Sequence, residues 1–273
     1  MLSMLLAFGS RGKPESAWKT KMGGHGLRQG QRRLGRGYPA ACASGGPRLI
    51  SVGLRKLANM VLELHPCTET DIPEFVRIQI AAFGTGGGMT SFMVEHPPSE
   101  TYINKSVDKH IKSFREEKDI TYLKVIDTEL DGQMIAGAKW RINQKERTEE
   151  EIQPMLPVPG ADEDGKQAMV DFIRYLNKVR REFMGTKPFY FLHILITDPA
   201  HHRRGAGAQL VRWGTEQADA AQLPSFLESS VMGRPLYARC GFTPRYEQRF
   251  DLTKYGGEGE DWNTVMIRDP VKT

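Results

Sequence analysis

The segment from Phe189 to Gly207 constrains the fold of this chain more than any other. Residues Phe189–Thr197 read FYFLHILIT, a nearly continuous apolar run of strand length. Such a run is typical of a strand that is buried on both faces of a sheet. Asp198-Pro199 ends it, a polar turn with Gly205 and Gly207 follows, and apolar residues at helical spacing then predict a helix: Leu210, Val211, Gly214, Ala218 and Ala221.

This order of strand, glycine turn and helix favours anion binding. It directs unpaired backbone N–H groups and the positive end of a helix dipole toward one point. Arg203 and Arg204 add charge beside the turn. The turn lacks both the G-x-x-x-x-G-K-[ST] pattern of a nucleotide-triphosphate loop and the third glycine of the dinucleotide fingerprint. We therefore predict a phosphate or pyrophosphate ligand, although a purely structural turn has the same pattern.

The residues before this segment predict a strand, two helices and a hairpin. Asp71 is the expected cap of the first helix, with Glu74 as its capping-box partner. A second helix is expected over Asn104–Glu117. Asp131-Gly132 is a hairpin turn signal between two alternating runs. The expected strands cover Val61–His65, Tyr122–Ile126 and Met134–Trp140.

Residues 141–187 have the pattern of an insertion. The part from Lys145 to Gly165 is acidic and rich in proline, which indicates a loop. The part after it carries one apolar helical face, and two interpretations stay open: a helix that covers the edge of the sheet, or a lid over a substrate cleft. Two further strands are expected at Ser225–Ser230 and Asn263–Arg268, with a loop over Tyr255–Asp261.

Charge separates the first 60 residues from the rest. They hold eleven of the 38 Lys and Arg but only one acid, Glu15, so that they carry +10 while the whole chain carries +5. Such a segment cannot bury enough apolar surface to fold, and we predict a disordered basic, Gly- and Arg-rich tail before a domain over 61–273. The tail is interpreted first as a non-functional extension, next as a mitochondrial transit peptide, and last as a nucleic-acid arm.

Cysteine and histidine usage indicates neither a disulfide framework nor a metal site. Cys42, Cys67 and Cys240 are scattered and contain no C-x-x-C pair. His201 and His202 are adjacent and diverge, without a spaced partner, so no metal is expected. The longest early apolar run is far short of a membrane span. A cytoplasmic location is expected, or a mitochondrial one if the tail is a transit peptide.

The residues around the turn, together with a second motif downstream, resemble the GNAT superfamily of N-acetyltransferases. The family pattern V-x-P followed by [QR]-x-x-G-x-[GA] is matched by Thr197-Asp-Pro199 and by His202-Arg-Arg-Gly205-Ala-Gly207. The pattern L-Y-x-x-x-G-F is matched by Leu236, Tyr237, Gly241 and Phe242. His202 and Thr197 depart from the usual Gln or Arg and the usual Val. The resemblance is strong over 189–250 and architectural over the rest of 61–268.

The resemblance implies a mixed α/β fold with a mostly antiparallel twisted sheet, flanked by helices, and an acetyl-CoA cleft at a splayed strand pair. Acetyl-CoA would be the co-substrate. Its pyrophosphate would be bound by the turn and helix start, and its pantetheine arm by the strand end. The implied binding residues are Leu195, Ile196, Thr197, His202, Arg203, Arg204, Gly205, Ala206, Gly207 and Ala208.

Two residues are candidates for proton transfer. Tyr237 occupies the general-acid position of the family, with a packed core tyrosine as the alternative. His193 is the candidate base, because strand alternation places it on the same face as Leu195 and Thr197 and because arylalkylamine acetyltransferases carry a His in a similar L-H-x-L setting. A buried core histidine is its alternative, and a water chain, Glu228 or Glu95 could also serve as base.

The resemblance therefore implies direct N-acetyl transfer, in a ternary complex, from acetyl-CoA to an amine of unknown identity. A small-molecule amine is the expected partner, and a nucleic acid or a membrane is not. Two alternatives from other classes are a catalytically silent CoA-binding module and a nucleic-acid-binding protein that uses the basic tail. Nothing in the sequence indicates an oligomeric state.

Overall fold

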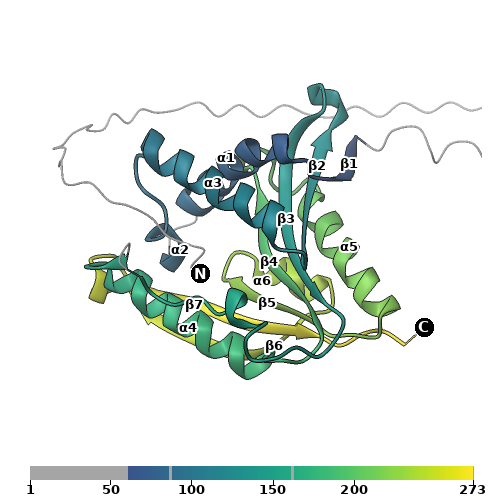
Figure 1. Cartoon of the computed structure of the whole chain (residues 1–273). Coiled ribbons are helices and arrows are strands. Elements are labelled where there is room, and N and C mark those ends of the chain that lie inside the picture. The colour runs from purple at the N-terminus through teal and green to yellow at the C-terminus, as the bar shows by residue number, and fades with distance from the viewer. Residues whose placement is uncertain (1–60, 86–87, 161–162, 273) are drawn as a thin grey trace, which may run out of the picture. The chain divides into compact units, whose positions relative to one another are not determined.

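The computed structural model describes residues 61–85, 88–160 and 163–272 (Figure 1). The predictions for the basic tail, 1–60, fall outside these residues. None of the described helices is long and apolar enough to cross a bilayer. Cys67 and Cys240 are both free thiols.

Seven strands form one sheet in the order β1-β2-β3-β4-β5-β7-β6. Every neighbouring pair is antiparallel except β4 and β5, which are parallel. This confirms the expected mixed α/β class with a mostly antiparallel sheet. The strands are β1 Leu62–Pro66, β2 Ile120–Asp127, β3 Gln133–Asn143, β4 Phe189–Thr197, β5 Ser225–Ser230, β6 Thr243–Asp251 and β7 Glu260–Arg268.

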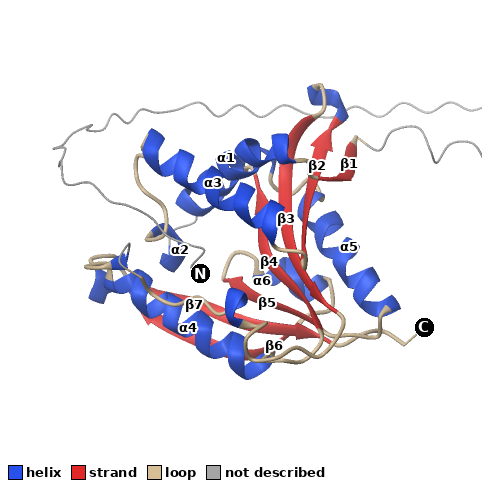
Figure 2. Ribbon diagram, in the orientation of Figure 1, coloured by secondary structure: helices blue, strands red, loops and turns tan. Residues whose placement is uncertain are grey.

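Helices cover both faces of the sheet. Figure 2 shows α1, α3 and α4 on one face and α5 on the other. The helices are α1 Ile72–Thr85, α2 Gly88–Ser91, α3 Glu100–Glu116, α4 Gln167–Phe183, α5 Ala206–Ala220 and α6 Arg234–Arg239. Helix α5 approaches the sheet closely at Gly214, where a Cβ would overlap the ring of Trp140. The indole N–H of Trp140 donates to the Leu210 carbonyl at 3.2 Å, and the residue is fully buried in the core.

The hairpin is formed as predicted, and the first helix begins differently. Asp131 and Gly132 both have positive φ, 52° and 78°, at the β2–β3 turn. Asp71 does not cap α1 with Glu74. Its carboxylate instead accepts the backbone N–H of Thr68 at 2.7 Å, because a 3₁₀ turn over Glu69–Asp71 precedes the helix and moves the capping box upstream.

The inserted helix α4 lies over one face of the sheet at its β6 edge. The aromatic ring of Phe172 packs against Phe250 of β6 with ring centroids 5.7 Å apart, and the Tyr175 hydroxyl donates to the Asn263 side chain of β7 at 2.8 Å. The helix therefore covers the edge strand and its neighbour. Strand β6 itself was not expected, because charged residues interrupt the alternation of TPRYEQRFD.

Candidate active site

Strands β4 and β5 stop pairing halfway along their length. They are hydrogen-bonded only where Tyr190–Leu192 faces Ser225–Leu227, and from there β4 follows β3 while β5 follows β7. We call the stretch beyond, residues 193–197 of β4 and 228–230 of β5, the splay. It is the splayed strand pair that the resemblance implies.

Backbone polar groups of β4 face the splay. The Asp198 N–H donates to the Ile135 carbonyl of β3 at 2.9 Å, so alternation directs the N–H and C=O of Thr197 and Leu195 toward the opposite, β5 side. The ring Nε2 of His202 lies 3.1 Å from the Thr197 carbonyl oxygen and forms a hydrogen bond with it. The backbone of Leu195 remains suited to pairing with an extended ligand arm, in the way that a further strand would pair.

The turn after β4 leaves the start of α5 uncapped. Gly205 is the N-cap residue, has φ 94°, and offers no side chain to the helix. The first helical bond runs from the Gln209 N–H to the Gly205 carbonyl at 3.1 Å, so the N–H groups of residues 206–208 have no acceptor within α5. A Cβ at Gly207 would lie 3.3 Å from Leu236 Cδ2 and 3.6 Å from Thr197 Oγ1. Free donors, a bare backbone and the helix dipole fit a diphosphate.

The two arginines of the turn differ. Arg204 Nη2 lies 2.6 Å from Asp127 Oδ2 at the end of β2, and the Asp127 side chain is only 1% exposed. Burial of Asp127 raises the pKa of its carboxyl, but the hydrogen bonds from Arg204 and from the Glu129 N–H, together with the charge of Arg204, lower the pKa overall. Arg204 therefore fastens the turn to β2 and is not a free charge. Arg203 is exposed and has φ 62°, which is rare for a residue with a side chain.

Tyr237 lies on α6, on the α5 side of the sheet. It is 8% exposed, its ring lies against Gly233, and its centroid is 6.2 Å from that of Phe242. Burial raises the pKa of its hydroxyl, which therefore stays protonated at neutral pH. Within the described part of the chain this hydroxyl has no hydrogen-bond partner, so it can donate to a ligand. The residue is both a core tyrosine and a candidate acid.

His193 does not share a face with Leu195 and Thr197, and that prediction is wrong. The β3–β4 register shifts between Lys139 and Trp140, which pair with Ile194 and Leu192 and leave His193 as the extra residue of a β-bulge. Leu195 consequently packs with the α5-side core, whereas Ile194 packs with the cluster below α1. His193 lies on this second face, against Phe191, with ring centroids 5.1 Å apart.

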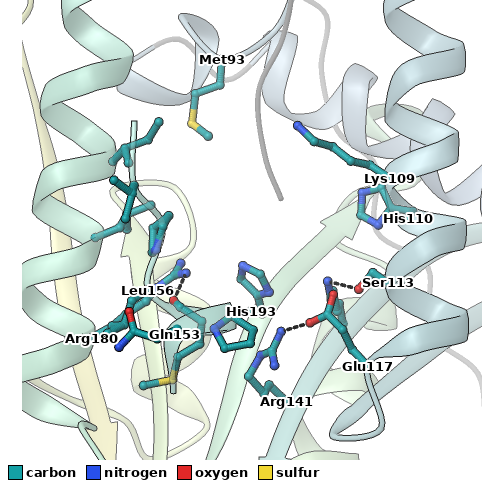
Figure 3. Close-up of a pocket in the computed structure, with 17 residues that line it drawn as sticks. Met93, Lys109, His110, Ser113, Glu117, Arg141, Gln153, Leu156, Arg180 and His193 are labelled. Carbon is teal, nitrogen blue, oxygen red and sulfur yellow. Dashed lines mark hydrogen bonds and ion pairs between the residues drawn. The ribbon is translucent and has the colours of Figure 1, made fainter. Parts of the chain in front are cut away.

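A cavity of about 180 Å³ lies on the His193 face (Figure 3). Its walls come from α3, β3, β4, α4 and the loop over 153–158. The inserted segment thus forms two walls of a cavity, as the lid interpretation requires. Its lining includes Lys109, His110, Ser113, Glu117, Lys139, Arg141, Met155, Leu156, Ile173, Leu176, Arg180 and His193.

Two buried arginines of the cavity wall are held by carboxylates. Arg141 contacts Asp119 at 2.7 Å and also Glu117. The Arg180 Nε lies 2.6 Å from Glu228 Oε1 of β5, and its Nη1 donates to the Met155 carbonyl at 3.0 Å. Because Glu228 is committed to this ion pair, it is a poor base. The other proposed base, Glu95, accepts a hydrogen bond from the Ser99 hydroxyl at 3.1 Å and does not line the cavity.

His193 is a neutral imidazole. Burial, and after it the charges of Arg180 and Lys139, lowers its pKa well below the ordinary value. Its Nδ1 is buried and has no partner among the described residues. Among the described residues, no contact joins His193 to Tyr237. The two side chains lie on opposite faces of β4. Among the described residues there is also no cluster of His, Cys, Asp and Glu that could hold a metal ion.

Sequence analysis did not select the charged residues of the cavity. Lys139 and Arg141 lie in the otherwise apolar strand QMIAGAKWRIN, and Arg180 lies on the apolar face of α4. A charge at a position that the pattern assigns to the interior is the signal that could have found them, since such residues are rarely buried without a partner.

Comparison with known proteins places these features in context. Residues 91–242 match the model of the acetyltransferase (GNAT) family. Three solved structures of similar fold illustrate its range. A Corynebacterium glutamicum protein described as histone acetyltransferase HPA2 and related acetyltransferase has a TM-score of 0.50 and 16% identity, covering 78% of this chain and 99% of that one.

The second is a mosquito arylalkylamine N-acetyltransferase, like 5b, with a TM-score of 0.51 and 14% identity, covering 76% of this chain and 99% of its own. The third is the C-terminal condensation domain of Ebony in complex with beta-alanyl-dopamine, with a TM-score of 0.51 and 13% identity, covering 76% and 98%. At these identities the three structures support the fold.

Proposed function

The chain belongs to the acetyltransferase (GNAT) family, and from this premise we propose that it transfers an acetyl group from acetyl-CoA to the amine of a small molecule. Transfer is direct, with both substrates bound at once. The observation that carries the proposal is the geometry of β4. One edge of this strand faces the splay, and one face of it contributes His193 to the cavity. A single strand therefore adjoins two binding compartments.

The donor side is formed by backbone groups. When bound, acetyl-CoA supplies the acetyl group as a thioester. The free N–H groups of residues 206–208 would bind its diphosphate, and the Leu195 backbone would pair with its pantetheine arm. Arg203 would contribute charge at the rim of the turn, while Arg204 orients the turn through Asp127.

The proton steps fall to two residues. An amine attacks only as the free base, and its ordinary pKa of about 10 means that a proton must be removed first. The neutral imidazole of His193 would accept this proton in the cavity. The Tyr237 hydroxyl, protonated and without a partner in the described residues, would donate a proton or hydrogen bond to the departing sulfur. The two residues lie on opposite faces of β4, so the amine would attack the thioester carbonyl carbon from the His193 side, and the C–S bond would break as the sulfur leaves toward Tyr237.

The decisive experiment measures free thiol release from acetyl-CoA in the presence of a panel of amines, alongside calorimetric binding of acetyl-CoA. We expect binding and amine-dependent thiol release. Binding without release for any amine would favour the silent CoA-binding module, and absence of binding would contradict the whole proposal. Deletion of residues 1–60 should leave acetyl transfer intact, which would separate this function from a nucleic-acid role of the tail. The cytoplasmic location stays a prediction.

A further inference from the structure

Lys139 differs from the other buried cations of the cavity wall. The residue is 5% exposed, and Arg141 and Arg180 are buried to the same extent, at 4% and 5%. Both arginines contact carboxylates, as described above. Lys139 Nζ donates to the Ser113 hydroxyl oxygen at 2.8 Å and lies 5.4 Å from the centroid of the Tyr122 ring. No carboxylate of the described residues forms an ion pair with it.

The nearest negative charge is already in use. Glu117 attracts Lys139 through space, but its carboxylate contacts Arg141. An ammonium group has three N–H donors, and the described residues provide an acceptor for one of them. A buried cation with unused donors is costly unless a ligand completes its shell. Since Lys139 lines the cavity, its remaining donors are available to a molecule bound there.

Two further features restrict what this molecule can be. The opposite wall is apolar, with Leu156, Ile173 and Leu176, which suits a hydrocarbon spacer. The cavity volume of about 180 Å³ is enough for a small ring or a short carbon chain. Beside burial, the charges of Arg180, Lys139 and Arg141 lower the pKa of His193, and of these three cations of the cavity wall only Lys139 lacks an ion-pair partner among the described residues. A simple alkylammonium ion would be repelled there.

We propose that the acetyl acceptor carries a carboxylate besides its amine, and that Lys139 binds this carboxylate in the cavity. This inference rests on the proposed function. The acceptor is then a small amino acid or amino-carboxylic acid, with its amine toward His193 and its spacer against the apolar wall. Burial lowers the pKa of Lys139 to about 8, so the free enzyme still carries the charge at neutral pH, and a bound carboxylate would hold it there.

The test compares each candidate acid with its own carboxamide. Glycine, β-alanine, 4-aminobutyrate and 2-aminobenzoate are each paired with the corresponding amide, and rates are calculated for the free-amine form. For the preferred spacer we expect kcat/KM for the acid to exceed that for the amide by roughly tenfold or more, the usual effect of a hydrogen bond to a charged group. The difference should lie mainly in KM.

Lys139→Met should reduce the acid-to-amide ratio to about one, mainly by raising KM for the acid. Lys124→Met is the matched control: this lysine, on the neighbouring strand, is bound by Asp71 at 2.7 Å and lies outside the cavity. It should keep the full ratio. If Lys139→Met fails to fold, the proposal is tested by Lys139→Arg and by the acid and amide pairs measured with the wild-type enzyme. Arginine keeps the charge, so this variant should keep part of the preference for the acid.

The proposal is overturned if no acid reacts faster than its amide, or if the preference survives in Lys139→Met. If no acid reacts faster than its amide but amines without a carboxylate are acetylated, the carboxylate proposal fails and the proposed function is still supported. A protein that neither binds acetyl-CoA nor releases thiol with any amine would remove the proposed function as well.

Discussion

The splay and the cavity lie on either side of one strand, yet they are constructed in opposite ways. The splay, with the turn and the start of α5, uses backbone N–H groups from a continuous stretch of chain, residues 195–208, and needs few side chains. The cavity uses charged side chains from α3, β3, β4 and α4, held by ion pairs between residues far apart in sequence. Local geometry thus provides one compartment, and tertiary packing provides the other.

The largest effect is expected where the cavity depends on a buried ion pair. Arg180→Met leaves Glu228 buried without its partner, and both side chains are only 6% exposed in the native protein. We expect a loss of about 3–5 kcal/mol in the free energy of unfolding, measured by denaturant titration. Arg181→Met is the control, because Arg181 pairs with Glu149 at the surface, and its loss should cost under about 1 kcal/mol. Equal losses of unfolding free energy in Arg180→Met and Arg181→Met would contradict the view that the cavity depends on its buried ion pair.

Tyr237→Phe tests whether the splay side contributes chemistry as well as binding. Removal of the hydroxyl should lower kcat by roughly 100-fold or more, since general acid catalysis typically contributes that much. Affinity for acetyl-CoA, measured by calorimetry, should change little. Tyr190→Phe is the control: its hydroxyl accepts from Gln144 at 2.8 Å, away from both compartments. An unchanged kcat in Tyr237→Phe would leave this residue a core tyrosine alone.

Acid should weaken the cavity side selectively, because its buried histidines stay neutral. Burial, together with the charge of Lys139, lowers the pKa of His110 to about 3. Below pH 6.5 the unfolded chain binds a proton there that the folded protein does not, so stability falls as pH falls from 6.5 toward 3. Between pH 7 and pH 5 this amounts to about 2 kcal/mol for one residue.

The measurement is denaturant unfolding at the two pH values. His110→Asn should remove most of the 2 kcal/mol from the pH dependence, whatever it does to stability at pH 7. Hydrogen exchange at pH 5 should show faster opening around α3 and β2 than around α5, and uniform opening would count against the contrast between the two sides.

The smallest effect is expected at the backbone of the turn. Gly205→Ala places a Cβ in open space but at φ 94°, which costs roughly 1–2 kcal/mol. Because this strain bears on the free N–H groups, affinity for acetyl-CoA should fall about tenfold. Gly256→Ala is a matched control with φ 80° and open space, so it should lose similar stability with unchanged affinity. Equal affinity in both variants would show that the turn is only structural.

The same contrast explains which parts could be predicted from the sequence. Strand β4, the turn and α5 follow one another directly, so periodicity and glycine position were sufficient, and the bounds expected for β4 and β5 agree with the structure. The cavity could not be found in this way. Lys139 meets Ser113 across 26 positions and Arg180 meets Glu228 across 48, and no local pattern records such distances. The bulge at His193 also escaped, because alternation assumes one residue per step.

That bulge has a consequence for how the molecule can change. In a regular strand, successive side chains alternate between the two faces of the sheet. A side chain can therefore move to the opposite compartment only if the register of the whole strand shifts. One surplus residue at His193 breaks this parity locally and turns the imidazole away from the layer that holds Leu195. Deleting this one residue would turn every side chain of β4 on one side of the deletion to the opposite face of the sheet. A point insertion in a strand is therefore enough to assign a reactive group to a different substrate.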